Sequence, residues 1–403
     1  MVSPARLCLV CKGSRHLCGW KICPLYYREK SIPAIKTRLK EDFFGPSTSI
    51  FIGHNFYPNV YVGPLTTLNE EKLGIIDHPV KWFGKPYGEI IEMRSFVMRA
   101  KSRENIYSHS KLIEKNQEIA LSIKPLDVEI KFRRKPAINF EFSDIIQPMG
   151  PSGILKYLKV TENPKIPRKI EKVLTDELKA EEAGFMLYKN GIDVYKLSVV
   201  LSSGILGYEG RKKLVPTRWS ITAVDDMIAK KLISNIKTYN QINEYLVFSS
   251  EYLDNHFEFL FIPGRWEFEN FEAWSPGTTW SFNLKRTEIL EEYESFQGRT
   301  KYANLQAGGY YASRLAVVEY LHKIRKQATV VGFREVREGY TIPLGVWLVR
   351  ETARNAFKSP PKKFSSLKDA LNNIGTRLRI DIHEFLKRSK ILRQKKLKDF
   401  YNL

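Results

Sequence analysis

The sequence predicts a mixed α+β protein. Short apolar stretches that alternate with polar residues, and are bounded by Gly, Asn or Pro, occur through the first two thirds of the chain and are typical of strands. Amphipathic helical spacing dominates the last third. With 403 residues the chain is long enough for two or three domains. We therefore expect a mixed-sheet N-terminal and central domain followed by a mainly helical C-terminal region.

Three regions carry clear strand patterns. Residues 49–64 predict two short strands around a turn, and residues 245–263 predict a hairpin. In the β-rich stretch 118–142, Val128, Ile130 and Phe132 alternate with charged residues, as in a half-buried strand.

Two further segments belong to the same sheet-rich part of the chain. Residues 194–206 predict a buried strand and then a turn that contains glycines. Residues 148–153 are rich in Pro and Gly and predict a hinge or a binding loop.

Helical patterns begin at residues 167–183 and dominate after residue 308. Residues 308–327 predict an amphipathic helix, with Arg314 on the side available to solvent or ligand. Residues 344–357 predict a second helix, and Ser366 with Asp369 forms the capping-box start of a third.

The net charge of +21 favours a polyanionic partner. Neutralising phosphates releases counterions, so DNA and RNA are the natural partners, and an anionic membrane surface is the weaker one. A charge-rich, thermophilic proteome is the alternative explanation. Without a long apolar run or a signal-peptide pattern, the chain is expected to be cytoplasmic and associated with the nucleoid, with no membrane partner.

All four cysteines lie within the first 23 residues, as Cys8-x2-Cys11-x6-Cys18-x4-Cys23. Zinc needs four soft ligands that converge tetrahedrally, and a segment this short would take its folding free energy from the metal. In a reducing cytosol such a cluster indicates a metal site before a disulfide. We expect a small structural zinc module, with His16 in place of Cys18 or a redox pair as the alternatives.

The last ten residues match the pattern by which proteins bind the sliding clamp PCNA. Gln394, Leu397, Phe400 and Tyr401 stand at the specified positions. In a short 3₁₀ turn, residues three apart lie on one side, so Leu397 and Phe400 can enter an apolar pocket together. The alternative is a frayed basic helix end that folds back on the body.

These assignments divide the chain into four parts. They are a zinc-binding module at 1–30, an α+β N-terminal and central domain at 31–285, a mainly helical C-terminal domain at 286–392 and a flexible PCNA-interacting tail at 393–403.

Several motifs spread over nearly the whole chain carry a family resemblance. They are the cysteine cluster, Pro216-Thr217-Arg218-Trp219-Ser220-Ile221-Thr222 followed by Asp225, Glu272-Ala273-Trp274, Ala307-Gly308-Gly309-Tyr310-Tyr311-Ala312-x-Arg314, Pro343-Leu344-Gly345-Val346-Trp347-x-Val349-Arg350-Glu351, and the tail. Together they resemble the archaeal Nre family of DNA repair proteins. The resemblance implies a role in DNA repair with PCNA as a partner, and it implies no catalytic mechanism.

Residues 216–226 are the first internal candidate site. Arg218 can clamp a phosphate, Trp219 can stack on a base, and Ser220 can add a hydroxyl contact. Asp225 and Asp226 have the oxygen ligands that Mg²⁺ or Mn²⁺ needs near a scissile phosphate. Alternatively, the arginine pairs with a nearby carboxylate and the tryptophan belongs to the core.

Three residues of the predicted hairpin and the segment after it can join that site if the hairpin folds over it. They are His256, Glu267 and Glu269, and we take Asp225 and Glu267 as the catalytic candidates.

The second internal candidate is the start of the predicted helix at residue 308. Free N–H groups at Gly308 and Gly309 favour an anion, and Arg314 lies one turn further on. Alternatively, the glycines only permit close packing. No P-loop, dinucleotide fingerprint or zinc-protease motif occurs in the sequence, which disfavours a nucleotide-driven motor.

Three functional hypotheses follow. The first is a PCNA-tethered DNA-processing enzyme, such as a metal-dependent nuclease. The second is a non-catalytic DNA-binding adaptor at the clamp. The third, an RNA- or ribosome-associated zinc protein, is disfavoured by the tail. The sequence leaves the oligomeric state open.

Overall fold

The computed structural model describes residues 30–138, 150–208, 210–276, 278, 281, 286–340 and 343–394. The chain forms two compact units, Met1–Ile228 (unit 1) and Ala229–Leu403 (unit 2). The division falls inside helix α9 (Thr217–Ile236). The predicted domain at 31–285 therefore contributes to both units.

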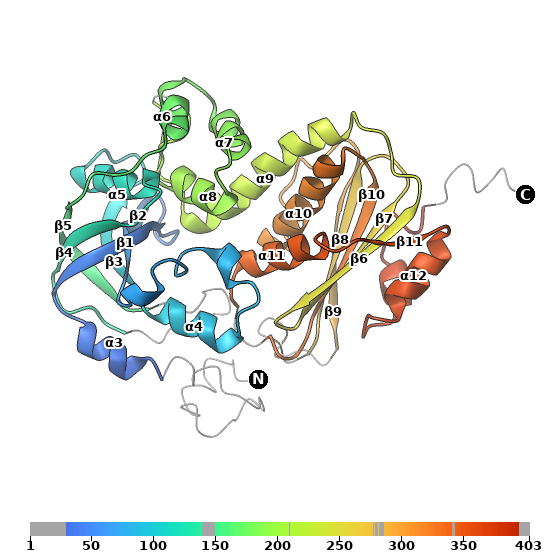
Figure 1. Cartoon of the computed structure of the whole chain (residues 1–403), viewed down its shortest axis with the longest axis horizontal. Coiled ribbons are helices and arrows are strands. Elements are labelled where there is room, and N and C mark those ends of the chain that lie inside the picture. Colours follow the sequence, from blue (N-terminus) through green and yellow to red (C-terminus); the bar gives the residue numbers. More distant parts are fainter. Residues whose placement is uncertain are drawn as a thin grey trace, which may run out of the picture. The chain divides into compact units, whose positions relative to one another are not determined.

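Unit 1 contains a closed five-stranded barrel in the order β1-β2-β3-β5-β4 (Figure 1). All neighbouring strands are antiparallel except β3 and β5, and pairing of β1 with β4 closes the barrel. Helix α5 (Lys111–Leu121) connects β3 to β4. This topology is that of an OB-type barrel. The strands are β1 (Asp42–Ile52), β2 (Asn59–Thr67), β3 (Val97–Asn105), β4 (Leu126–Phe132) and β5 (Ser152–Val160).

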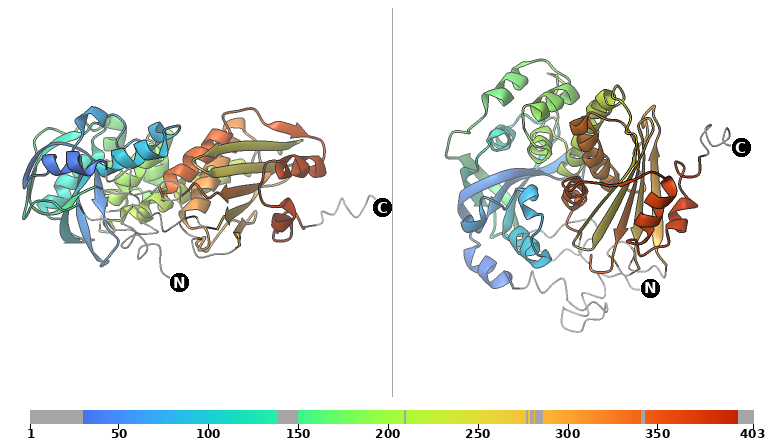
Figure 2. Two further views of the ribbon diagram at one scale, coloured as in Figure 1. Left: turned by 90° about the horizontal axis from the view of Figure 1, so that it is seen from below. Right: turned by 45° about the vertical axis from the view of Figure 1, so that its right-hand side comes forward.

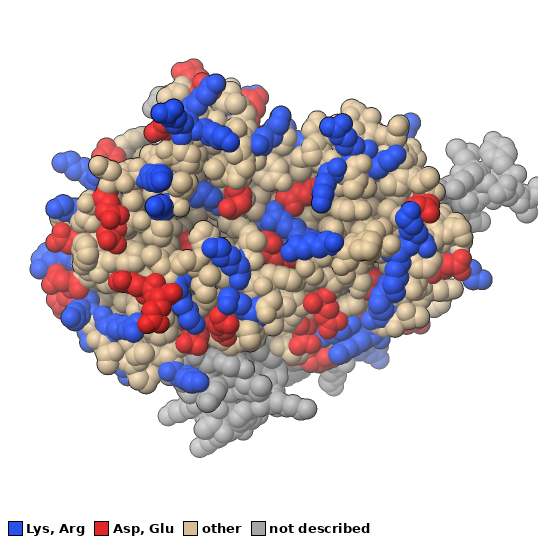
Figure 3. All heavy atoms as spheres, viewed as in Figure 1, with Lys and Arg blue, Asp and Glu red and all other residues tan. Residues whose placement is uncertain are grey.

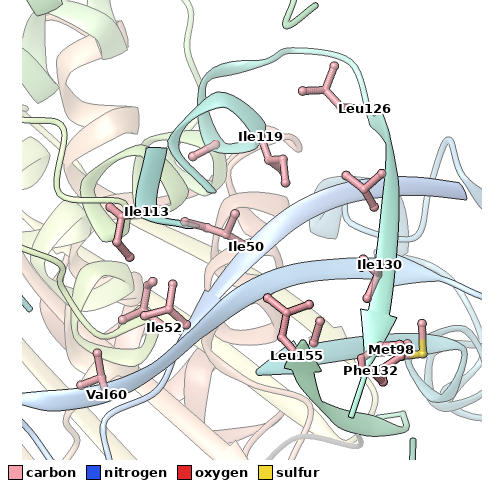
Figure 4. Packing of buried hydrophobic residues seen from close by; sticks show 14 of the residues in the cluster. Ile50, Ile52, Val60, Met98, Ile113, Ile119, Leu126, Ile130, Phe132 and Leu155 are labelled. Atoms are coloured by element: carbon pink, nitrogen blue, oxygen red, sulfur yellow. The ribbon is translucent and has the colours of Figure 1, made fainter. Parts of the chain in front are cut away.

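Alternation of apolar and charged residues explains how the strands enclose a core. In β4, Val128, Ile130 and Phe132 are buried while the residues between them are exposed, which confirms the half-buried strand predicted there. Helix α5 adds Ile113 and Ile119 to the same cluster (Figure 4). Each fully buried side chain of this size stabilises the fold by roughly 1.5–3 kcal/mol.

The helical pattern at 167–183 is confirmed, and it belongs to two helices, because the chain leaves the helical conformation at Asp176. Residues 118–142 are less β-rich than expected, because α5 extends to Leu121. In the predicted loop at 148–153, Pro151 and Ser152 are buried at the start of β5, and 148–149 lie outside the described residues.

The buried strand predicted at 194–206 was wrong, because the segment is helix α8 (Val194–Ser202). Asp193 caps the helix by accepting hydrogen bonds from the backbone N–H groups of Tyr195 (2.8 Å) and Lys196 (2.9 Å). A short apolar run cannot by itself distinguish a buried strand from a buried helix, and the cap decides here. The other helices of unit 1 are α3 (Ile32–Arg38), α4 (Tyr87–Ser95), α6 (Arg168–Thr175) and α7 (Ala180–Lys189).

Unit 2 contains a six-stranded sheet in the order β11-β6-β7-β10-β8-β9. Neighbouring strands are antiparallel except β10 and β8. The predicted hairpin is confirmed as β6 and β7, and its turn residues Leu253 and Asp254 both have positive φ, as a tight two-residue turn requires. The strands are β6 (Tyr245–Tyr252), β7 (Asn255–Ile262), β8 (Glu267–Trp274), β9 (Glu288–Glu294), β10 (Thr329–Val336) and β11 (Lys362–Phe364).

Helices cover both faces of this sheet (Figures 1 and 2). On one face, the rings of Phe248 and Phe261 pack against Tyr320 of α10 (Gly308–Ile324) and against Phe357, which follows α11 (Val346–Ala356). On the other face, α12 (Leu367–Gly375) and α13 (Ile382–Leu386) cover a separate apolar cluster. Strand β7 is buried along its whole length, as expected for a strand covered on both sides.

The helices predicted at 308–327 and 344–357 are confirmed, as is the cap at Ser366, whose side chain accepts from the backbone N–H of Asp369. The expectation of a mainly helical region at 286–392 needs correction. Strands β9, β10 and β11 lie in that range and pair with β8, β7 and β6. In the parts of the chain that the structure describes, no helix is long and apolar enough to cross a membrane.

A substitution at Gly63 of β2 tests how closely β2 and β3 approach each other in the barrel. A Cβ atom at this position would collide with the backbone carbonyl oxygen of Ala100 in β3. Gly63→Ala is therefore expected to lower the free energy of unfolding by about 1–3 kcal/mol or more, measured by urea denaturation. Gly74→Ala is the control, because its Cβ would enter open space. Equal stability of the two variants would contradict the observed β2–β3 spacing.

Candidate functional site

The structure separates the residues predicted at the start of α9. Arg218 is exposed and Trp219 is 46% exposed, so both side chains are available to a ligand. Ser220 is fully buried, and its hydroxyl donates to the carbonyl of Thr217 at 2.9 Å. The prediction that the Ser220 hydroxyl contacts a ligand was therefore wrong, whereas Arg218 and Trp219 both lie at the surface.

Hydrogen bonds fix the start of α9 to the barrel. The Thr217 hydroxyl accepts from the backbone N–H of Ile52, at the end of β1, at 3.0 Å. It also lies 3.3 Å from the hydroxyl of Ser202, at the end of α8. Trp219 then packs against Tyr57 from the β1–β2 loop, with ring centroids 5.2 Å apart and ring planes at 51°.

The side chains predicted to be catalytic or to bind a metal already interact with other groups of the protein. Asp225 is fully buried on α9 and has interaction partners, as does Asp226. Glu267 begins β8 in unit 2 and accepts a hydrogen bond from the Tyr293 hydroxyl at 2.8 Å. His256 lies 2.9 Å from both Glu251 and Glu258. Among the described residues, no group of three or more His, Cys, Asp and Glu side chains is arranged to hold a metal ion.

The anion site predicted at Gly308, Gly309 and Arg314 is filled by the protein's own carboxylates. A Cβ on Gly309 would collide with the Glu272 carboxylate, so the glycine permits close packing. Arg314 was expected to be available to solvent or ligand, but its side chain is fully buried, 2.5 Å from the Glu294 carboxylate. The packing alternative therefore fits this helix start.

Glu269 of β8 was a candidate for the active site, and the structure gives it a different role. Its buried carboxylate accepts a hydrogen bond from the hydroxyl of Ser389 and others from the backbone N–H groups of Lys390 (2.6 Å) and Ile391 (3.4 Å). Burial raises the pKa of Glu269 to about 7, although these hydrogen bonds oppose the shift. Glu269 thus anchors the segment that leads into the tail.

Two more buried glutamates on the same face hold the preceding residues. Glu258 of β7 receives both a 2.7 Å and a 2.6 Å hydrogen bond from the Arg377 guanidinium. Glu335 of β10 accepts from the backbone N–H groups of Arg379 and Ile380, each at 2.9 Å. The available sequence signal for these anchors was a glutamate beside apolar residues, as in Phe257-Glu258-Phe259 and Phe268-Glu269, in segments with a strand pattern.

Sequence reasoning also missed a row of cations and rings on the barrel. Arg99, Lys101 and Arg103 occupy alternate positions of β3, which places them on one side of the strand. Lys101 lies 5.7 Å from the ring of Tyr61 on β2, and Arg103 lies 5.1 Å from the ring of Phe56 in the β1–β2 loop. The alternation of basic residues from 99 to 103 was the available signal.

Charge by itself does not locate a binding surface. Figure 3 shows Lys and Arg side chains interspersed with Asp and Glu on the face that it presents. The site must therefore be argued from specific neighbours, and the four cysteines, with Leu397, Phe400 and Tyr401, lie outside the described residues.

The two predicted phosphate-binding arginines should behave differently when replaced. Arg314→Met leaves Glu294 buried without its cation, and we expect the free energy of unfolding to fall by about 3–5 kcal/mol. Arg218→Met at the exposed position should change stability by less than about 0.5 kcal/mol. Urea denaturation of both variants checks this. A fully stable Arg314→Met variant would contradict the buried pair.

The raised pKa of Glu269 predicts a pH dependence of stability. An unfolded glutamate titrates near pH 4.3, so between about pH 4.5 and 7 the folded state holds more protons than the unfolded state. The contribution of Glu269 to the free energy of unfolding therefore falls as pH rises through that window. Between pH 5 and pH 8, the free energy of unfolding of the wild type should fall by on the order of 3 kcal/mol more than that of Glu269→Gln.

Urea denaturation of both proteins at pH 5 and pH 8 measures this difference. Glu338→Gln, at an exposed position of unit 2, is the matched control and should keep the pH dependence of the wild type. If Glu269→Gln kept it as well, the shifted pKa would be wrong.

Comparisons with known proteins agree with the motifs. The family model "Archaeal Nre, N-terminal" matches residues 17–281, and "Archaeal Nre, C-terminal" matches 294–400. The chain is 40% identical to DNA repair protein NreA of Archaeoglobus fulgidus, covering 92% of this chain and 93% of the relative. It is 37% identical to NreB of that organism, covering 96% and 97%, and 32% identical to NreA of Haloferax volcanii, covering 86% and 85%.

No solved structure matches the chain. The two family models are separated by residues 282–293, and the domain boundary expected from the sequence, between 285 and 286, falls in that interval. The two compact units of the structure divide elsewhere, after Ile228. The two family models together cover most of the sequence, as does each of the three relatives. The chain therefore belongs to the archaeal Nre family.

Proposed function

We propose that this protein is a DNA repair factor that binds DNA through unit 1 and is recruited to the sliding clamp PCNA by its C-terminal tail. Its relatives carry the name DNA repair protein, which supports the first part. The observation that carries DNA binding is the exposed pair Arg218 and Trp219, held in place beside Tyr57.

The chemistry of that pair suits a nucleic acid. A guanidinium can donate two hydrogen bonds to one phosphate, and an exposed indole can stack on a base. The net charge of +21 adds long-range attraction to a polyanion. Together these features support DNA contact at the start of α9.

The segment before the tail suits clamp recruitment. The three buried glutamates tie residues 377–391 to the sheet, and Gln394, the first residue of the clamp-binding pattern, is exposed. The nine residues from 395 to 403 can extend roughly 30 Å from that point. The remaining motif residues can therefore reach a pocket on another protein while unit 2 stays folded.

Between the two modes of action, we favour a non-catalytic adaptor over a nuclease that uses Mg²⁺ or Mn²⁺. Metal-dependent strand cleavage needs carboxylates that are open to a metal and a scissile phosphate. Asp225 is buried, and Glu267 already accepts the Tyr293 hydroxyl. The adaptor hypothesis needs neither residue to be available.

A structural zinc site remains part of this proposal. Cys8, Cys11, Cys18 and Cys23 supply four thiolates, the donor set that closes a tetrahedral zinc site. Such a site would stabilise the first 30 residues and would have no open position for catalysis.

Removing the tail tests recruitment. A chain truncated after Arg393 should lose measurable PCNA binding in isothermal titration calorimetry, because it lacks the apolar side chains of Leu397, Phe400 and Tyr401. Its DNA affinity and unfolding curve should match those of the full chain. In the full chain, Phe400→Ala should weaken PCNA binding strongly, whereas Lys398→Ala, at an unspecified position of the motif, is the matched control. Unchanged PCNA affinity after truncation would refute the assignment.

A further inference from the structure

The β1–β2 loop and strand β3 of unit 1 display aromatic rings and cations side by side. Phe56 is 63% exposed, Tyr57 43% and Trp219 46%. Burying such rings would stabilise the protein, so three exposed rings gathered on one loop and the adjoining helix start indicate a binding surface. We define the aromatic strip as Phe56, Tyr57, Tyr61, Lys101, Arg103 and Trp219.

The rings of the strip form two pairs. Phe56 and Tyr61 meet edge to face, with centroids 6.3 Å apart and planes at 82°. Tyr57 and Trp219 form the second pair, with centroids 5.2 Å apart. Phe56 and Tyr57 are consecutive residues, so the β1–β2 loop contributes one ring to each pair.

Cations accompany the first pair. Lys101 lies 5.7 Å from the Tyr61 ring and Arg103 lies 5.1 Å from the Phe56 ring. Arg103 and Tyr61 are direct partners in the β3–β2 ladder, and Arg103 is exposed. A ligand that stacks on these rings therefore meets positive charge beside each one, which favours an anionic backbone over an apolar protein segment.

The backbone holds the loop in a strained shape that presents Phe56. Its φ of 66° is uncommon for a bulky residue. The backbone N–H of Asn59 donates to the carbonyl of Phe56 at 2.9 Å, and that of Gly53 donates to Tyr61 at 2.7 Å. Strain that the surroundings maintain is typical of binding sites.

These observations distinguish a single strand from a duplex. In a duplex, the faces of the bases are stacked inside the helix and cannot reach a protein ring. Single strands expose those faces, and stacking on aromatic side chains is largely independent of sequence. The β2–β3 face and the loop between the first two strands are also where OB-type barrels bind oligonucleotides.

We propose that the aromatic strip binds single-stranded DNA, with bases stacked on its rings and phosphates near Lys101, Arg103 and Arg218. This proposal rests on the DNA binding proposed above and specifies which form of DNA is bound and where. It requires neither the tail nor PCNA.

The test uses the full chain and fluorescence anisotropy with an end-labelled oligothymidylate. Loss of one stacking ring costs about 1–3 kcal/mol, so Phe56→Ala and Trp219→Ala should each weaken binding about 5- to 150-fold. Trp219→Phe keeps a stacking face and should restore most of the affinity. Lys101→Ala should reduce the slope of log affinity against log salt by about 0.7.

Tyr157→Ala is the matched control, because Tyr157 is a 48% exposed ring on β5 outside the strip. It should change the affinity less than twofold, and melting curves should show that every variant is folded. Wild-type affinity in Phe56→Ala and Trp219→Ala would overturn the proposal, as would equal loss in Tyr157→Ala.

Two further probes separate the possible failures. Tighter binding of a hairpin duplex than of the single strand would overturn this inference but leave DNA binding in place, and tighter binding of oligouridylate would overturn the assignment to DNA. If neither form of DNA bound at low salt, the proposed DNA binding would fail as well.

Discussion

Three buried glutamates on one face of the unit 2 sheet hold residues 377–391 in place. Glu258 accepts a hydrogen bond from the Arg377 guanidinium. Glu335 and Glu269 accept hydrogen bonds from backbone N–H groups further along the chain, those of Ile380 and Lys390. Burying carboxylates is costly unless they are hydrogen-bonded, so the anchored segment and the sheet stabilise each other. The residues that lead to Gln394 are consequently held at a fixed point on the sheet, which suits the clamp recruitment that we propose.

In unit 1, pairing between the strands of the barrel positions the residues of the aromatic strip. β4 pairs with Asp42–Ser47 of β1, whereas the end of β1 pairs with β2, where Ile52 lies opposite Val62. The Ile52 N–H in turn donates a hydrogen bond to Thr217 at the start of α9. This places Trp219 against Tyr57, while the β2–β3 ladder aligns Tyr61 with Arg103. The strip therefore depends on pairing between segments that are distant in the sequence. The clamp recruitment and the DNA contact that we propose belong to different units, so separate substitutions can test each of them.

Local patterns predicted much of the fold. The β6–β7 hairpin, helices α10 and α11 and the cap at Ser366 follow from turn chemistry and apolar periodicity. Helix α8 was mistaken for a strand because a short apolar run fits either structure. Arg218 and Trp219 were proposed from residue type and lie at the surface, but Arg314 was misjudged, because its partner Glu294 lies on a strand twenty residues earlier. Long-range pairing cannot be read from such patterns.

The most direct test of the account is photocrosslinking of the full chain to a single strand that carries 5-iododeoxyuridine, with the crosslinked residues mapped by mass spectrometry. Halogenated bases crosslink preferentially to the aromatic rings on which they stack. We expect crosslinks at Phe56, Tyr57 or Trp219, and their loss when excess unlabelled single strand is added. Crosslinks confined to unit 2, with none in the β1–β2 loop or at the start of α9, would contradict the account.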